Sequence, residues 1–193
     1  MSYSERINAI INSSVQVKQS LLSHAELLTS IEKAVEEIVI CFRNGGKVLF
    51  CGNGGSAADA QHLAAELSGR FYKDREPLFA EALHVNTSYI TAVANDYSFD
   101  EVFSRLVKAK GRKGDVLVAM STSGDSANIV KAIEVACKLE MKTVGLTGKS
   151  GGKMRGLCKY LIDVPSEDTP RIQECHILIG HIICELVEKE LFA

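Results

Sequence analysis

Five short apolar runs alternate with segments of helical periodicity, and this alternation limits the possible fold more than any other feature. Between the runs, apolar residues recur three and four positions apart. Strands that are apolar throughout and alternate with helices are typical of a parallel sheet covered on both faces. We therefore predict an α/β fold with a doubly wound, five-stranded parallel sheet flanked by helices. The expected strands are residues 47–51, 78–85, 116–120, 143–147 and 160–164, and the expected helices are 56–68, 89–94, 99–109, 127–139 and 172–191.

Two further helices are expected before the first strand. Apolar residues in about the first 45 positions follow the i, i+3, i+4, i+7 spacing of amphipathic helices. Gly45 and Gly46 are expected to end the second of them. The chain has 193 residues, 46% of them hydrophobic, which suits one core. We expect residues 1–193 to form a single domain.

Charge and hydropathy argue against several classes of partner. The formal net charge is −2, with no basic run, so neither nucleic acid nor an anionic membrane is expected to bind. No apolar stretch approaches the ~20 residues that a membrane span needs. The N-terminus lacks the features of a signal peptide, so we expect a cytoplasmic protein.

The six cysteines form no C-x-x-C pair, which gives no sign of a zinc knuckle or a redox motif. Most lie in apolar segments, where we expect them to be small buried hydrophobic residues. They are Cys41, Cys51, Cys137, Cys158, Cys175 and Cys184.

Two loops rich in glycine and serine follow predicted strands directly. Open parallel sheets bind ligands at the carboxyl ends of their strands. Residues 52–56 have the sequence Gly-Asn-Gly-Gly-Ser and open a helix, where free N–H groups favour an anion. Residues 121–126 hold four hydroxyls beside another helix start, which suits a phosphate monoester.

Each of these loops also permits a different interpretation. The hydroxyls of residues 121–126 could be helix caps, although one cap needs only one hydroxyl. Gly52-x-Gly54-x-x-Ala57 loosely fits the dinucleotide fingerprint. The acidic residue expected ~20 positions later is not clearly placed, and a dinucleotide site would leave the serine-rich loop without a role.

Chemistry-bearing side chains gather on two predicted helices. His62 and Glu66 are four residues apart and share a face, where they could bind a metal, pass a proton or simply be solvated. On the last helix, His176 and His181 lie about 140° apart around the axis, so they cannot easily point into one pocket. Spacing alone does not choose between them.

Other polar residues are less decisive. Asn95 and Asp96 lie between two predicted helices, where Asp is usually a cap but could also bind a sugar hydroxyl. His24 and His84 have no polar constellation around them and are expected to be structural or surface residues.

Five motifs together resemble the phosphoheptose isomerases of the sugar-isomerase (SIS) domain family. The resemblance runs from the N-terminal helices to the last helix. The motifs are CGNGGSAADAQHLAAELSGR (residues 51–70), ANDYSFDEVFSR (94–105), GDVLVAMSTSGDSANIVKAI (114–133), LTGKSGG (146–152) and TPRIQECHILIGHIICELVE (169–188).

The resemblance implies a ketose–aldose isomerase. The implied reaction converts D-sedoheptulose 7-phosphate to D-glycero-D-manno-heptose 7-phosphate for bacterial surface-heptose biosynthesis, in a lipopolysaccharide or a capsule. It also implies a homotetramer with active sites at subunit interfaces, and one zinc ion per subunit. The expected partners are thus a phosphosugar substrate and further copies of the same chain.

By motif position, the resemblance assigns site residues and selects His181 over His176. The implied metal ligands are His62, Glu66, Gln173 and His181, and the implied catalytic residues are Glu66 and His181. Some relatives carry Asp where this chain has Pro170, so that position receives no catalytic role. The implied substrate-binding residues are Asn53, Gly54, Gly55, Ser56, Glu66, Asn95, Asp96, Ser121, Thr122, Ser123, Ser126 and Gln173.

Isomerisation of this kind needs a base for a carbon-bound proton and stabilisation of the enediolate oxygens. Glu66 is our candidate base and His181 our candidate general acid. A metal could stabilise the oxyanion as a Lewis acid, although a tightly bound Glu66 is a poorer base. Metal ligation and proton transfer by Glu66 could therefore alternate.

Two alternatives to this function stay open. One SIS relative is non-catalytic and binds a replication-initiation protein, but that type lacks the glutamate and final histidine corresponding to Glu66 and His181. The other alternative is an isomerase of a different phosphosugar, which would use the same site.

Overall fold

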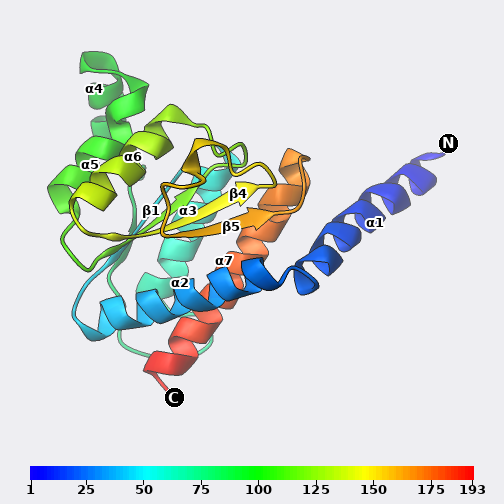
Figure 1. The fold of residues 1–193 in the computed structure, drawn as a ribbon, viewed down its shortest axis with the longest axis horizontal. Coiled ribbons are helices and arrows are strands. Elements are labelled where there is room, and N and C mark those ends of the chain that lie inside the picture. Colours follow the sequence, from blue (N-terminus) through cyan, green and yellow to red (C-terminus); the bar gives the residue numbers. More distant parts are fainter.

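A five-stranded parallel sheet forms the centre of the molecule (Figure 1). The computed structural model describes all residues, 1–193. The strand order is β2-β1-β3-β4-β5, and every pair is parallel. The chain leaves β1 towards one edge and then returns to the other side of β1, which places the topological switch point between β1 and β3. The strands are β1 (Val48–Gly52), β2 (Ala80–Ala82), β3 (Val116–Met120), β4 (Lys142–Gly148) and β5 (Tyr160–Val164).

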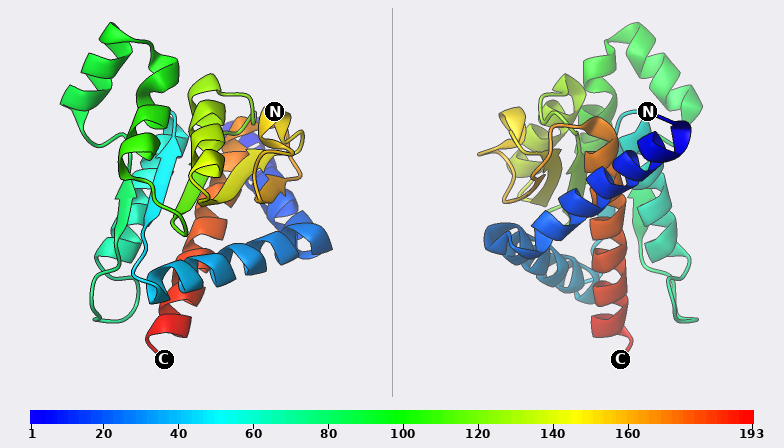
Figure 2. Two further views of the ribbon diagram at one scale, coloured as in Figure 1. Left: turned by 60° about the vertical axis from the view of Figure 1, so that its left-hand side comes forward. Right: turned by 90° about the vertical axis from the view of Figure 1, so that its right-hand side faces the viewer.

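Helices cover both faces of this sheet, so the predicted fold class is confirmed (Figure 2). Helices α2, α3 and α7 pack on one face, while α5 and α6 cover the other with α4 at their edge. The helices are α1 (Tyr3–Leu22), α2 (Ala25–Arg43), α3 (Gly55–Ser68), α4 (Thr87–Asp96), α5 (Val102–Lys110), α6 (Ala127–Lys138) and α7 (Thr169–Leu191), with 3₁₀ turns η1 (Phe99–Glu101) and η2 (Gly152–Met154).

The continuous apolar character of the strands follows from this double covering. Val48 and Phe50 of β1 point into the core beneath α2, α3 and α7. Leu49 and Cys51 point into the opposite core beneath α5 and α6. Because successive side chains of a strand alternate between faces, both sets must be apolar when both faces are covered.

The two predicted N-terminal helices are present, but the first has little to pack against. Helix α1 projects from the body of the molecule (Figure 1), and Leu21 is its one buried residue. Ser14 of α1 donates a hydrogen bond to Glu174 of α7 at 2.6 Å. The apolar stripe of α1 lies largely in solvent; its members Ile7, Ile10, Ile11 and Val15 are each more than 40% exposed.

Three elements differ from the expectation by three residues or more at one end. The second strand is only Ala80–Ala82, because it is an edge strand that pairs with β1 alone. Residues 99–101 form a 3₁₀ turn before α5. Helix α7 begins at Thr169 rather than at residue 172, because Pro170 lies in its first turn, where a missing N–H costs nothing.

The expectation for the cysteines is confirmed for four of the six, which are buried. The other two differ: Cys137 is exposed on α6, and Cys158 is only half-buried. None is in a disulfide. Separately, the helices of the structure include none that combines the length and the apolarity that crossing a membrane requires.

Candidate active site

Helices α3 and α7 bring three of the predicted site residues together. His62 Nε2 lies 3.0 Å from His181 Nε2 and 3.3 Å from Glu66 Oε1. The ligand atoms of all three side chains lie within 4.8 Å of one another. The histidines are 119 positions apart in the sequence, so this cluster exists only because the two helices pack side by side.

Gly180 permits this close packing. A Cβ atom at Gly180 would lie 2.4 Å from the side chain of Leu63. Gly180 and Leu63 are the chain neighbours of His181 and His62, so the helices approach most closely where the histidines face each other. Gly180 was not among the predicted site residues; its signal was a glycine inside a long helical pattern, which usually marks close packing.

The three side chains fit a zinc ion. Two atoms that each lie 2.0–2.2 Å from a tetrahedral ion are about 3.3–3.6 Å apart. The distances from His62 Nε2 to His181 Nε2 and to Glu66 Oε1, 3.0 and 3.3 Å, are close to this separation. Two imidazoles and one carboxylate are also donors that zinc favours. The arrangement supports the expectation of a metal at His62, Glu66 and His181, and the zinc itself stays a prediction.

Asp59 lies one turn before His62 on α3 and was missed in the sequence. Its Oδ2 atom is buried and has no hydrogen-bond partner. Burial raises the pKa of Asp59, while the nearby His62 and His181 act in the opposite direction. The spacing of Asp59 and His62, i and i+3, was the available signal.

The side-chain amide of Gln173 lies beside the glycine loop, residues 52–56. A Cβ atom at Gly55 would lie 2.5 Å from Gln173 Nε2, so a larger residue there would displace the amide of Gln173. Gly55 is the first residue of α3 and lies two turns before His62. The role of Gln173 as a metal or substrate ligand stays a prediction.

The glycine loop contacts the start of α6, the helix that follows the serine loop (residues 121–126), through a pair of amides. Asn53 and Asn128 each donate a side-chain hydrogen bond to the other, both at 2.9 Å. Gly54 has φ 55° and ψ −121°, a conformation that favours glycine, and it starts α3 without a side-chain cap. The first N–H groups of α3 are thus left for a ligand, beside Ser56, which is buried.

The serine loop directs several hydroxyls towards one point. Ser121 Oγ lies 3.0 Å from Ser126 Oγ and 3.3 Å from Ser123 Oγ. Ser126 holds the N-cap position of α6 but makes no side-chain cap bond. A capping role therefore fails for Ser126, and the start of α6 keeps its free N–H groups.

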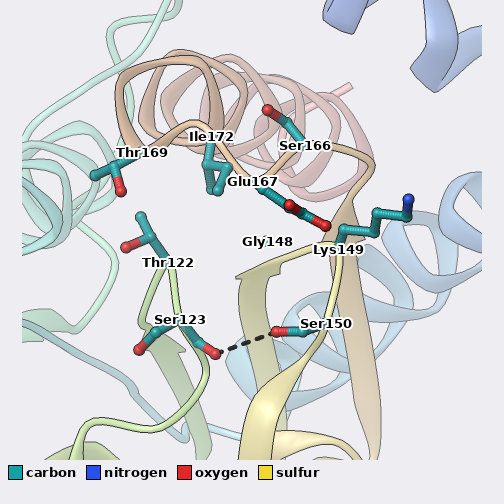
Figure 3. Close-up of a pocket in the computed structure, with 9 residues that line it drawn as sticks. All are labelled: Thr122, Ser123, Gly148, Lys149, Ser150, Ser166, Glu167, Thr169 and Ile172. Atoms are coloured by element: carbon teal, nitrogen blue, oxygen red, sulfur yellow. Dashed lines mark hydrogen bonds between the residues drawn. The ribbon is translucent and has the colours of Figure 1, made fainter.

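A small polar cavity opens beside the serine loop (Figure 3). Its volume is about 190 Å³, and Ser150 Oγ donates to the carbonyl oxygen of Ser123 at its wall, at 3.4 Å. Of the predicted residues, it includes Thr122 and Ser123. The remaining lining residues had no predicted role, although residues 149–152 follow β4 at the same sheet edge. The lining consists of Thr122, Ser123, Gly148, Lys149, Ser150, Ser166, Glu167, Thr169 and Ile172.

Asn95 and Asp96 are not brought to the cluster within one chain. They are the last two residues of α4, where Asn95 Nδ2 donates to Asp96 Oδ1 at 2.9 Å. Helix α4 packs mainly against η1 and α5, on the other side of the sheet from α3 and α7 (Figure 1). The N-cap of η1 is Ser98, so Asp96 is not the cap that its position suggested.

The structure separates the two histidines of α7. His181 joins the cluster, whereas His176 is fully buried, and its Nε2 lies 3.1 Å from the carbonyl oxygen of Thr147 in β4. Burial lowers the pKa of His176 to about 4, so the ring is neutral at pH 7. His24 caps α2 by accepting from Leu27 N–H, as expected for a structural residue.

Comparison with known proteins identifies the family. The family model described as "SIS domain" matches residues 14–148. The phosphoheptose isomerase of Aneurinibacillus thermoaerophilus is 51% identical over 186 residues, covering 96% of this chain and 94% of the relative. The chain belongs to the phosphoheptose isomerase family of SIS-domain proteins.

Solved structures of the family have the same fold. The phosphoheptose isomerase of Neisseria gonorrhoeae is 44% identical with a TM-score of 0.91, and the match covers 97% of this chain and 100% of that one. The phosphoheptose isomerase of Francisella tularensis is 41% identical with a TM-score of 0.93, covering 98% and 100%. Membership of this family makes the chain an isomerase and argues against a non-catalytic SIS protein.

Proposed function

We propose that the chain interconverts D-sedoheptulose 7-phosphate and D-glycero-D-manno-heptose 7-phosphate, for bacterial surface-heptose biosynthesis. The observation that carries the proposal is the cluster of His62, Glu66 and His181, two of them on the helix that the glycine loop opens, in a phosphoheptose isomerase fold. An aldose–ketose isomerase needs a base, an acid and an electrophile at one place. This cluster can supply all three.

Glu66 serves as the base that moves a proton between adjacent carbons of the open-chain sugar. Its side chain is 23% exposed, which leaves it open to substrate while partly shielding it from water. The carboxylate removes the carbon-bound proton and returns it to the neighbouring carbon. His181 donates and recovers the hydroxyl protons as the carbonyl group changes place.

His62, Glu66 and His181 would hold the metal, with Gln173 as the proposed fourth ligand. When bound, zinc supplies Lewis-acid stabilisation of negative charge on the substrate oxygens. Glu66 therefore has two duties, as a ligand and as a base. Its neighbour His62, 3.3 Å away, would remain a ligand to the metal when the carboxylate acts as the base.

The serine loop binds the phosphate. The hydroxyl of Ser121 lies within hydrogen-bonding distance of those of Ser123 and Ser126, and the start of α6 offers free N–H groups. Hydroxyls and helix-start amides are good donors to phosphate oxygens. Asn53 and the first residues of α3 then face the sugar hydroxyls from the neighbouring loop.

The working enzyme is a homotetramer with sites completed across subunits. Two apolar surfaces support this proposal: the α1 stripe and a groove of about 760 Å³ between α2 and α7. Exposed apolar patches of this kind mark sites of association. The distance of α4 from the cluster adds support, because only a second subunit could bring Asn95 and Asp96 to this site.

Turnover of sedoheptulose 7-phosphate by purified, zinc-loaded protein tests the proposal. The aldose product is detected after chemical reduction and chromatography. Other ketose phosphates of different chain length are assayed beside it. A higher kcat/KM for one of those, or no turnover of the heptulose, would contradict the proposed substrate. The cytoplasmic location stays a prediction, which cell fractionation tests.

A further inference from the structure

A buried ion pair lies between α7 and the end of α3, away from the proposed reacting groups. Glu188 Oε2 accepts from Arg75 Nε at 3.1 Å, and each side chain is 2% exposed. Neither residue has a role in the proposed chemistry. Replacing a buried ion pair by apolar groups is often neutral or stabilising, so stability alone does not explain its presence.

The Glu188 carboxylate accepts hydrogen bonds from the segment that follows α3. It accepts backbone N–H groups from Phe71, Tyr72 and Lys73 at 3.1, 2.8 and 2.9 Å. Burial by itself raises the pKa of Glu188, but these amides and Arg75 together bring it below its ordinary value. Glu188 is therefore charged and fully hydrogen-bonded.

The Arg75 guanidinium attaches this carboxylate to the carbonyl end of α3. It donates to the carbonyl oxygens of Glu66 at 3.0 Å and Leu67 at 2.8 Å. A further bond, of 3.1 Å, goes to Gly69. The planar fork of arginine can serve several acceptors at once, whereas the lysine ammonium is a single point charge.

Both residues of the ion pair are linked to the cluster of His62, Glu66 and His181. Glu188 lies seven residues after His181, two turns along the same face of α7. Arg75 bonds to the backbone of Glu66 itself. Phe71, held by its N–H, places its ring 5.9 Å from the ring of His181.

We propose that Glu188 and Arg75 are positioning residues that set α3 against α7 and thereby hold His62, Glu66 and His181 at metal-binding spacing. The inference rests on the proposed function. Ligand atoms of a tetrahedral ion tolerate little change in separation, and groups behind the ligands typically contribute 10–100-fold to affinity or activity. The Glu188–Arg75 pair acts on the two helices rather than on the substrate.

The test compares Glu188→Gln with a matched variant, Asp115→Asn. Asp115 is also a buried carboxylate that accepts two backbone N–H groups and a cation, Lys47, but it lies at the amino end of β3. Glu188→Gln is expected to speed zinc release to a chromogenic chelator by ~10-fold or more and to lower kcat by a similar factor. KM should change less, because the serine loop is unaffected.

Asp115→Asn is expected to lose stability while keeping kcat and the zinc release rate of the native protein. All rates are referred to folded protein, measured by circular dichroism. If Glu188→Gln matches Asp115→Asn in kcat and zinc release, the pair is merely structural and the proposal is wrong. Arg75→Lys keeps the charge but loses the planar fork, and it is expected to show the same defects as Glu188→Gln. It replaces Glu188→Gln in the test if that variant does not fold.

Failure of the proposed function is recognised separately in the same experiment. A native protein that binds zinc but does not turn over the heptulose phosphate contradicts the proposed substrate, while the zinc release rates still decide the role of Glu188. If the native protein turns over substrate without zinc, the kcat values of Glu188→Gln and Asp115→Asn decide the role of Glu188. Arg75→Lys with native kcat and native zinc release contradicts the positioning role.

Discussion

At the residue scale, the proposed chemistry depends on side chains that face one another from two helices. Glu66 and His181 come from different helices, and His62 lies between them. Its Nε2 atom is 3.0 Å from His181 Nε2 and 3.3 Å from Glu66 Oε1. This close contact means that each of the three residues has both an electrostatic and a geometric effect on the others. Substitutions at the cluster therefore change turnover much more than folding.

Glu66→Gln and His181→Asn are each expected to lower kcat by at least ~10²-fold, because removing a general acid or base typically costs 10²–10⁴-fold. Glu66→Gln nearly preserves shape, and both side chains are partly exposed, so folding should be retained. Steady-state kinetics and bound-zinc analysis check this. Full activity in Glu66→Gln would contradict the proton-transfer role.

The hydroxyls of the serine loop are expected to act on binding rather than on chemistry. Ser121→Ala and Ser126→Ala should each raise KM by about 10-fold or more, with kcat changed less, because the phosphate is remote from the reacting carbons. Removing one hydrogen bond to a charged group costs ~1.5–3 kcal/mol. Initial-rate measurements over a range of substrate concentrations check this. An unchanged KM in both variants would place the phosphate elsewhere.

At the element scale, most of the architecture could be predicted because its signals are local. Five apolar runs and their intervening periodicity follow directly from a sheet covered on both faces. The short β2 and the 3₁₀ turn before α5 could not be predicted, because edge pairing and helix starts depend on tertiary contacts. The contact of His62 with His181 likewise depends on the packing of α3 against α7.

The choice between the two histidines of α7 shows the same limit. Spacing placed His176 and His181 on different faces but could not say which face met α3. Family resemblance selected His181, and the structure agrees through the close approach at Gly180. Asp59, Gly180 and the Arg75–Glu188 pair were missed, because their importance lies in contacts between segments far apart in the chain.

His176, at the junction of β4 and α7, is expected to make the stability of the folded protein depend on pH. Its pKa falls to about 4 in the folded protein, from an ordinary value near 6.5. The unfolded state therefore binds more protons between these values, and stability falls as the pH drops through this window. The full effect is about 3 kcal/mol, and it is complete below pH 4.

Urea unfolding of the native protein and of His176→Gln, at pH 7 and pH 5, checks this expectation. The variant should be less stable at pH 7, because it perturbs a fully buried group bonded to Thr147. Its stability should fall less than that of the native protein between the two pH values. An equal fall in both proteins would show that His176 is not the titrating group.

At the scale of the whole molecule, one chain leaves several features without a partner. The apolar stripe of α1 and the groove between α2 and α7 are exposed, and α4 holds Asn95 and Asp96 away from the cluster. A symmetric assembly would account for all three, because it buries apolar faces and brings α4 of one subunit to another. The proposed assembly has consequences for both solution size and activity.

Ile10→Asp is expected to reduce the tetramer to smaller species, because it puts a charge in the middle of the α1 stripe. Ile10 is 57% exposed in one chain, so the folded subunit itself should tolerate the change. Light scattering and circular dichroism check these two outcomes. A tetramer of native size would show that the α1 stripe is not an assembly surface.

Subunit mixing tests whether the active site is shared. Asp96→Asn and His181→Asn are each expected to be nearly inactive alone. If Asp96 of one subunit serves the His181 cluster of another, unfolding the two variants together and refolding them should restore about a quarter of the sites, because each site then draws one residue from each of two randomly chosen subunits. If both residues serve the same subunit's site, every site keeps one defect and no activity returns. Activity of the mixture, compared with each variant refolded alone, thus separates a site shared between subunits from a site within one chain, and it does so without depending on which apolar surface forms the interface.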